Sequence, residues 1–204
     1  MRWTKLIGIV AASMIWSSVE AGEFNQVLSI GDMAPSWKDL PGTDGKSHSL
    51  SEFKDKDAVV LVFTCVSCPY SVDYEDRFNS LAKKYGGPNG NVGFVGICVN
   101  QIAADRLDKL TERAKKQQFA FPVLYDESQK IAKDFGTIFT PEFYVLNSER
   151  KIVYMGAMDD ANEPSNVKKR FVEDAIVATL KGESPPVKET GARGCMVRWA
   201  REKR

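Results

Sequence analysis

One stretch decides the fold, Val59-Val60-Leu61-Val62-Phe63-Thr64-Cys65-Val66-Ser67-Cys68-Pro69, in which a continuous apolar run leads into two cysteines. Such a run is typical of a strand buried on both faces. The segment after Pro69 is amphipathic, which predicts that the cysteines lie at the N-terminus of a helix. Unpaired backbone N–H groups and a partial positive charge at that end favour thiolate over thiol. The stretch therefore predicts a site for thiol chemistry.

The chain beyond this stretch alternates between strand and helix patterns. Three apolar runs predict strands, each followed by a helical pattern: 58–63 before 69–85, 92–99 before 103–114, and 121–125 before 126–135, where Asp126 and Gln129 resemble an N-cap pair. A hairpin over 142–155 and a last helix capped by Ser165 complete the pattern. The order gives a βαβ half followed by a ββα half.

The first 21 residues are predicted to be a secretory signal peptide. Arg2 and Lys5 precede a short apolar stretch, and Val19-Glu20-Ala21 has the small-x-small pattern of a cleavage site. The apolar stretch is too short to cross a bilayer as a spanning helix. We therefore expect an exported protein, secreted or periplasmic, that is cleaved near Ala21.

The remaining chain is expected to form one domain with a tail. Residues 22–184 make up the expected domain, and Pro185-Pro186 is expected to detach a tail over 185–204 from the last helix. After removal of the first 21 residues, basic and acidic side chains are equal in number. This balance gives no reason to expect nucleic acid or an anionic membrane as a partner. We expect a monomer.

All four cysteines follow the expected cleavage site: Cys65, Cys68, Cys98 and Cys195. Disulfides form and persist in an oxidising compartment, but four cysteines are too few for a disulfide framework in a chain of this length. A reactive Cys65–Cys68 pair with two further thiols is the better interpretation. The alternative is a permanent Cys65–Cys68 disulfide, although so short a loop gains little stability from a cross-link.

Several motifs resemble the thioredoxin fold in its redoxin (AhpC/TSA-like) branch. They are Gly31-Asp32-Met33-Ala34-Pro35 with Asp44-Gly45-Lys46, Thr140-Pro141 before the hairpin, and the combination of Phe63-Thr64-Cys65-Val66-Ser67-Cys68-Pro69-Tyr70, Tyr74-Glu75-Asp76-Arg77 and Gly194-Cys195-Met196-Val197-Arg198-Trp199. That combination is similar to a group of bacterial thioredoxin family proteins. The resemblance covers about residues 29 to 199. It implies an α/β fold with a central mixed sheet flanked by helices, an N-terminal redoxin extension and a C-terminal tail.

The resemblance implies a thiol–disulfide oxidoreductase of the antioxidant, redoxin type, without a cofactor or a metal. In that fold Cys65 is expected to be the exposed nucleophile with the lower pKa, and Cys68 the recessed thiol that resolves the mixed disulfide. Protein or small-molecule disulfides are the expected substrates, and a reducing partner protein is the expected electron source.

Pro141 resembles the cis-proline that packs opposite the cysteine pair in this fold. A cis bond would expose the backbone of Thr140 for strand-like pairing with an extended substrate. A trans proline in an ordinary loop is the alternative. Two departures from thioredoxins are Thr64, where those proteins usually carry tryptophan, and Val59, where a buried acid often sits.

No residue is assigned to proton transfer at the second cysteine. Asp73 and Glu75 are candidates, although a solvated place on the helix explains each of them as well. Cys98 ends the second predicted strand, where a small buried hydrophobe needs no further explanation.

Cys195 lies in the Gly-flanked tail among apolar neighbours. We expect Trp199 to pack against the domain and to hold Cys195 within reach of a domain thiol, since burying an aromatic side chain is favourable. Cys195 is then either a third redox partner of the Cys65–Cys68 pair or a partner of Cys98.

Two other functions fit parts of the sequence. Aligned on the Cys-Pro step, Cys68-Pro69 resembles the peroxidatic Cys-Pro of peroxiredoxins, although Cys65 then replaces a threonine that helps to organise the peroxide in that family. A copper-delivery protein of the Sco group shares the fold, and soft thiolates suit Cu(I). That group has three residues between its cysteines and a late histidine, whereas this chain has two residues there and only His48.

Overall fold

A five-stranded mixed sheet forms the centre of the computed structural model, which describes residues 22–87 and 89–200. The expected signal peptide lies outside these residues. The strands in sheet order are β5 (Val123–Tyr125), β4 (Val92–Cys98), β3 (Ala58–Phe63), β7 (Glu142–Asn147) and β8 (Ile152–Gly156). The first three are parallel to one another, and β7 is antiparallel to both β3 and β8. The predicted order of strands and the mixed sheet are confirmed.

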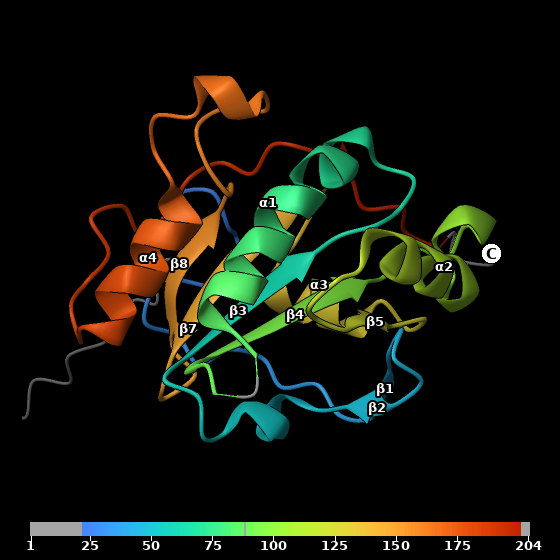
Figure 1. Ribbon diagram of the computed structural model, residues 1–204, viewed down its shortest axis with the longest axis horizontal. Helices are drawn as coiled ribbons and strands as arrows, with labels where there is room; N and C mark the ends of the chain where they lie inside the picture. Colours follow the sequence, from blue (N-terminus) through green and yellow to red (C-terminus); the bar gives the residue numbers. More distant parts are fainter. Residues whose placement is uncertain (1–21, 88, 201–204) are drawn as a thin grey trace, which may run out of the picture.

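Helices cover both faces of this sheet. Figure 1 shows α1 (Pro69–Tyr85) and α4 (Phe171–Leu180) in front of the sheet, with α3 (Lys130–Phe135) behind it. A further helix, α2 (Leu107–Gln117), lies at the right-hand end of that view. Within the described residues, no helix combines the length and apolar character needed to span a membrane.

The continuous apolar run of β3 supplies both cores. Val60 and Val62 belong to the core under α1 and α4, whereas Val59, Leu61 and Phe63 belong to the core on the opposite face. Successive strand residues point to opposite faces, so a strand covered on both sides is apolar at every position.

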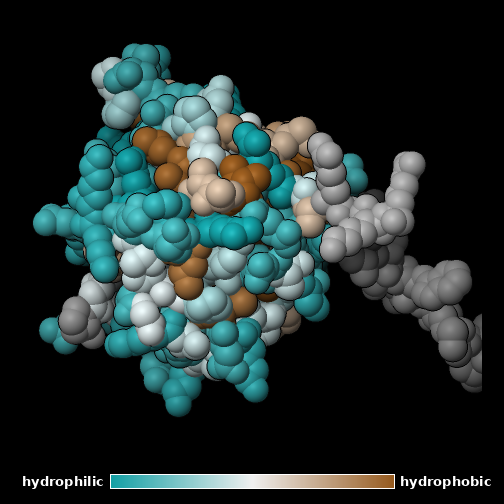
Figure 2. Space-filling model, turned by 90° about the vertical axis from the view of Figure 1, so that its right-hand side faces the viewer, coloured by the Kyte–Doolittle hydropathy of each residue, from teal (hydrophilic) through white to brown (hydrophobic). Residues whose placement is uncertain are grey.

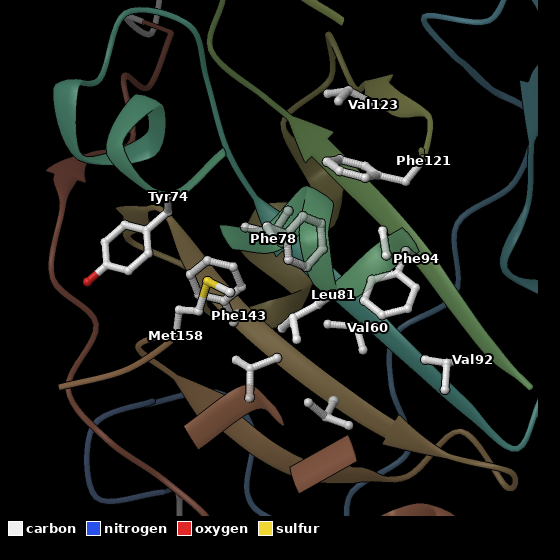
Figure 3. Close-up of a cluster of buried hydrophobic side chains, with 14 of the residues drawn as sticks. Val60, Tyr74, Phe78, Leu81, Val92, Phe94, Phe121, Val123, Phe143 and Met158 are labelled. Atoms are coloured by element: carbon white, nitrogen blue, oxygen red, sulfur yellow. The ribbon is translucent and has the colours of Figure 1, made fainter. Parts of the chain in front are cut away.

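Phe78 of α1 is the centre of the first core. Its ring lies 5.6 Å from that of Phe94, 4.7 Å from that of Phe121 and 5.6 Å from that of Phe143, between centroids (Figure 3). Aromatic pairs at these separations stabilise beyond the area that they bury. This packing fixes the helix that carries the cysteine pair.

The N-terminal extension covers the opposite face together with α3. It contains a short hairpin of β1 (Leu40–Pro41) and β2 (Ser47–His48) and the 3₁₀ turn η1 (Leu50–Phe53). Trp37 and Leu50 are buried in the second core beside Phe135 of α3. The extension is therefore part of the folded body.

Three predicted helices begin later than the sequence pattern indicates: α3 begins at Lys130 and not at 126, and two others begin after a separate turn. The first of these two begins at Leu107, after the separate turn η2 (Ala103–Asp105). The second begins at Phe171, and Ser165 lies in the turn η3 (Pro164–Asn166). The reason in the second case is the carboxylate of Asp160, which accepts the backbone N–H groups of Lys168 and Lys169 at 2.9 and 3.0 Å.

The C-terminal tail follows α4, which ends at Leu180, and then stays on the body. The N–H of Met155 in β8 donates to Lys188 O, and the N–H of Thr190 donates to Met155 O, both at 3.1 Å. An edge strand with unpaired backbone groups gains hydrogen bonds from such a neighbour. The tail then crosses the top of the view in Figure 1 and ends on the side of α2.

Figure 2 shows this end of the molecule from outside. Hydrophilic residues cover most of it, and hydrophobic residues gather in patches between them. The final part of the tail includes the strand β9 (Cys195–Met196), which pairs antiparallel with β6 (Phe139–Thr140). The pairing places Cys195 directly opposite Thr140.

Candidate active site

The cysteine pair lies at the junction of β3 and α1. Cys68 is the N-cap residue of α1, and Pro69 is its first residue, a position at which proline costs no helical hydrogen bond. Cys65 is 3% exposed and Cys68 is 1% exposed. The expectation of an exposed Cys65 is therefore wrong, because Thr140 lies against its sulfur.

Thr140 contacts both thiols. The Thr140–Pro141 bond is cis, which confirms the resemblance to the cis-proline loop. Thr140 Oγ1 lies 3.4 Å from the sulfur of Cys65, and the thiol of Cys68 donates to Thr140 O at 3.0 Å. The hydroxyl of Thr140 also donates to Cys195 O at 3.4 Å. The backbone edge that was expected to receive an extended substrate is therefore occupied by β9.

The acidity of the two thiols is opposite to the expectation. A hydrogen bond from the thiol of Cys65 lowers the pKa of Cys68 to about 4 against the effect of burial, with help from the backbone N–H groups of Ser71 and Cys195. The same hydrogen bond, followed by burial, raises the pKa of Cys65. The N-terminus of α1 adds partial positive charge next to Cys68, its N-cap residue. These effects favour ionisation of Cys68, which breaks the hydrogen bond that its protonated thiol donates to Thr140 O.

A third thiol completes the cluster. Cys195 is half-buried and packs against the cluster that contains Cys65 and Cys68. Burial, followed by its interaction with Cys68, raises the pKa of Cys195 to about 11. All four cysteines are free thiols.

Cys98 lies apart from this cluster, as a buried residue at the end of β4. It is fully buried, and its thiol donates to Asp105 O at 3.5 Å. Burial raises the pKa of Cys98 to about 12. Of the two partners that the sequence left open for Cys195, the structure shows the cysteine pair and not Cys98.

Asp105 fixes the loop between the two cysteines and was missed by the sequence analysis. Its side chain is fully buried, and its carboxylate accepts Ser67 N–H at 2.8 Å, Ser67 O–H at 2.6 Å and the amide of Asn100 at 2.9 Å. Buried carboxylates are found where several donors satisfy them. Asp105 ends η2, and this inward turn separates η2 from α2.

Two buried amide side chains hold the tail. Asn100 Oδ1 accepts Arg198 N–H at 2.8 Å. Gln129 Nε2 donates to Arg198 O at 2.9 Å, and Gln129 Oε1 accepts Ala200 N–H at 2.7 Å. Gln129 thus pairs with the tail as a neighbouring strand would. Gln129 is the N-cap residue of α3, but its side chain makes no capping bond; the carboxylate of Asp126 accepts the Ile131 N–H at 2.9 Å instead.

Val197, and not Trp199, anchors the tail in the core. Val197 is 4% exposed and packs in the second core, whereas Trp199 is 38% exposed and lies under the ammonium group of Lys133 at 5.9 Å. The prediction that the tail brings Cys195 to a domain thiol is confirmed, but its anchor residue was wrong.

Neither candidate for proton transfer, Asp73 or Glu75, contacts a cysteine sulfur among the described residues. Glu75 pairs with Arg113 at 2.6 Å, and the structure assigns no bond between Asp73 and a thiol among the described contacts. Glu142, next to Pro141, is a buried acid that the sequence analysis missed. Burial raises its pKa to about 7, although Tyr144 O–H donates to it at 2.8 Å.

The fold and the thiol cluster define a redox protein of the thioredoxin type. Residues 29–171 match the Redoxin family, and the chain belongs to that family. Its relatives include "Peroxiredoxin Q, chloroplastic" of Triticum aestivum, with 28% identity over 135 residues, 63% of this chain and 58% of the relative. The chain therefore spans less than two thirds of that relative's length.

Two solved structures resemble most of the chain. An uncharacterized conserved protein from Geobacillus kaustophilus has a TM-score of 0.79 and 30% identity, over 88% of this chain and 96% of that one. A putative thiol:disulfide interchange protein DsbE from Chlorobium tepidum has a TM-score of 0.62 and 20% identity, over 75% of this chain and 99% of that one. The second similarity shows the shared fold alone.

Proposed function

We propose that this chain is a thiol–disulfide oxidoreductase in which Cys68 is the attacking thiolate and Cys65 the resolving thiol. The observation that carries the proposal is the position of Cys68 as the N-cap residue of α1, where the partial positive charge of the helix end favours a thiolate, with Cys65 in the same loop. The thiolate is the nucleophile in disulfide exchange. This order of roles reverses the one expected from the sequence.

Two exchange steps balance the reaction. The thiolate of Cys68 attacks one sulfur of a substrate disulfide, and the other sulfur leaves as a thiolate that takes up a proton. Cys65 then gives up its proton and attacks the sulfur of Cys68 in the mixed disulfide. The second substrate sulfur leaves as a thiolate, and a Cys65–Cys68 disulfide remains. The substrate disulfide is reduced by two electrons, and the cysteine pair is oxidised by two.

The substrate class follows from the position of β9, which pairs with β6 beside the two cysteines. An extended protein substrate reaches the edge of β6 only after β9 leaves it, whereas a small disulfide needs less of that edge. We propose small-molecule disulfides and mobile protein segments as substrates, with a reducing partner protein as electron source. Export, cleavage near Ala21 and the monomeric state stay predictions.

Peroxide reduction is the second candidate, because Cys68 combines a lowered pKa with a helix N-cap position. The thiolate of Cys68 would attack a peroxide oxygen, release water or an alcohol after protonation, and become a sulfenic acid. A neighbouring thiol would then condense with it, forming a disulfide and a second water. A relative of this chain is named as a peroxiredoxin.

Disulfide reductase activity with cysteine variants tests the proposal. We expect Cys68→Ser to abolish the reduction of insulin and of glutathione disulfide, and Cys65→Ser combined with Cys195→Ser to accumulate a mixed disulfide on Cys68. Cys98→Ser is the matched control, because Cys98 lies apart from the thiol cluster. Full activity of Cys68→Ser would show that the assignment is wrong.

A further inference from the structure

Cys68 has two thiol partners, one in its own loop and one in the tail. Cys65 and Cys68 both contact Thr140, at 3.4 and 3.0 Å, and Cys195 lies directly opposite Thr140 and packs against the cluster that contains both cysteines. A disulfide between Cys68 and either partner therefore leaves the other thiol beside the bond. Disulfide exchange needs this arrangement, in which a thiol attacks one sulfur of an adjacent disulfide.

The tail is shaped to bring Cys195 to this place. A Cβ atom on Gly194 would lie 2.5 Å from the carbonyl carbon of Thr140 and closer still to its oxygen. Only glycine allows the tail backbone to approach the cis-proline loop so closely. The residue after it, Cys195, is then in register with Thr140.

A chain of hydrogen bonds links the tail to the loop of the cysteine pair. Arg198 N–H donates to Asn100, the amide of Asn100 donates to Asp105, and Asp105 accepts both donors of Ser67. Asn100 and Asp105 are buried, so these bonds are shielded from water. The same buried groups therefore fix both sides of the thiol cluster.

We propose that Cys195 is a third redox thiol. It attacks Cys68 in the Cys65–Cys68 disulfide, and a dithiol reductant then reduces the resulting Cys68–Cys195 disulfide. This inference rests on the proposed function. The thiolate of Cys195 attacks the sulfur of Cys68, the Cys68–Cys195 bond forms and the Cys65–Cys68 bond breaks. Cys65 leaves as a thiolate and takes up the proton that Cys195 lost, so the step moves no net electrons.

A dithiol then restores the reduced chain. Its first thiolate attacks the sulfur of Cys195, and Cys68 leaves as a thiolate. Its second thiolate attacks the mixed disulfide and releases Cys195 as a thiol, so the dithiol ends as a disulfide and supplies two electrons. Cys195 is half-buried, whereas Cys65 is 3% and Cys68 is 1% exposed. The transfer therefore carries the reducible bond toward solvent.

The charges around Cys195 favour its attack on Cys68 once the Cys65–Cys68 disulfide has formed. Burial and the interaction with Cys68 raise the pKa of Cys195, while the charge of Arg198 lowers it. Once Cys68 is bound in a disulfide, it carries no negative charge, so its opposition to the ionisation of Cys195 disappears and only burial still raises the pKa of Cys195. Cys195 therefore ionises more readily after the Cys65–Cys68 bond has formed.

Disulfide mapping by mass spectrometry tests the proposal in the full chain. After oxidation with glutathione disulfide, we expect both Cys65–Cys68 and Cys68–Cys195 peptides from the unaltered chain, and only Cys68–Cys195 from Cys65→Ser. Cys195→Ser should still form Cys65–Cys68, but dithiothreitol should reduce it more slowly, by about tenfold or more.

Two glycine variants of the tail supply a matched pair that keeps every thiol. Gly194→Ala should lower the yield of Cys68–Cys195, because its Cβ meets the backbone of Thr140. Gly191→Ala should not, because its Cβ would meet only the ring of Phe24, at 3.5 Å. The inference is overturned if no Cys68–Cys195 peptide forms in the unaltered chain or if Cys195→Ser is reduced at the unaltered rate. A loss of the Cys65–Cys68 disulfide as well would instead count against the proposed function.

Discussion

Thr140 and Cys195 lie opposite each other in the antiparallel pair of β6 and β9. Together, these two residues contact both thiols of the Cys-x-x-Cys motif. Thr140 meets Cys65 through its hydroxyl and Cys68 through its carbonyl, while Cys195 meets Cys68 through its own thiol. The chain therefore places part of itself where an extended substrate would pair. Access to the site and the position of the tail are linked by this contact.

Ionisation of Cys68 should be measurable in the reduced protein. We predict that one thiolate persists down to about pH 4, because hydrogen bonds to Cys68 lower its pKa to about 4 from 9.0. The ultraviolet absorbance of the thiolate, followed against pH, measures this. Cys68→Ser should remove the acidic transition and Cys98→Ser should keep it. A single transition near the ordinary thiol pKa would contradict the prediction.

Gln129 should contribute measurably to stability through the tail. Gln129→Ala removes hydrogen bonds to the tail groups Arg198 O and Ala200 N–H and leaves the buried Val99 O without this donor, so we predict a loss of about 1–3 kcal/mol in the free energy of unfolding. Urea titration measures the loss. Gln26→Ala, at an exposed position, is the control and should change it by less than about 0.5 kcal/mol. Equal effects of the two substitutions would show that the tail contacts add nothing.

Glu142 should make stability depend on pH. The folded chain holds its proton up to about pH 7, whereas the unfolded chain releases it near 4.5, so rising pH between these values favours the unfolded state. We predict that the free energy of unfolding falls over this range, by a few kcal/mol at most, and that Glu142→Gln flattens the fall. Denaturant titrations at several pH values measure it. An unchanged slope in Glu142→Gln would place the titrating group elsewhere.

Peroxide should be a poorer substrate than a disulfide. In the alignment on the Cys-Pro step, Cys65 stands where peroxiredoxins carry the threonine that helps to organise the peroxide. We predict that hydrogen peroxide oxidises Cys68 about tenfold or more slowly than a small disulfide does at equal concentration. Stopped-flow oxidation with each oxidant measures the ratio. A faster reaction with peroxide would favour the second candidate function.

The sequence predicted those parts of the fold that depend on local periodicity. The apolar run ending at Phe63 and the proline at position 69 set the boundary between strand and helix, and both were placed correctly. The helix starts at Leu107 and Phe171 were missed, because side chains of Asp105 and Asp160 bind backbone and loop groups there. No local pattern distinguishes such a carboxylate from a solvated one.

The sequence predicted which cysteines form the thiol cluster, but it did not predict which of them has the lower pKa. The sequence placed Cys65 and Cys68 together and brought Cys195 near a domain thiol, but it assigned the lower pKa to Cys65. The order of acidity depends on which sulfur accepts hydrogen bonds, and the tail supplies one of them through the N–H of Cys195. Contacts between residues so distant in sequence leave no trace in spacing or composition.

Trapping of the mixed disulfide tests the central claim most directly. In a chain with both Cys65→Ser and Cys195→Ser, we predict that a small disulfide forms a stable mixed disulfide on Cys68, identified by mass spectrometry of the peptide. The matched chain with Cys68→Ser and Cys195→Ser should form little adduct on Cys65, because that thiol is 3% exposed and its burial alone still raises its pKa. Faster adduct formation on Cys65 than on Cys68 would contradict the account.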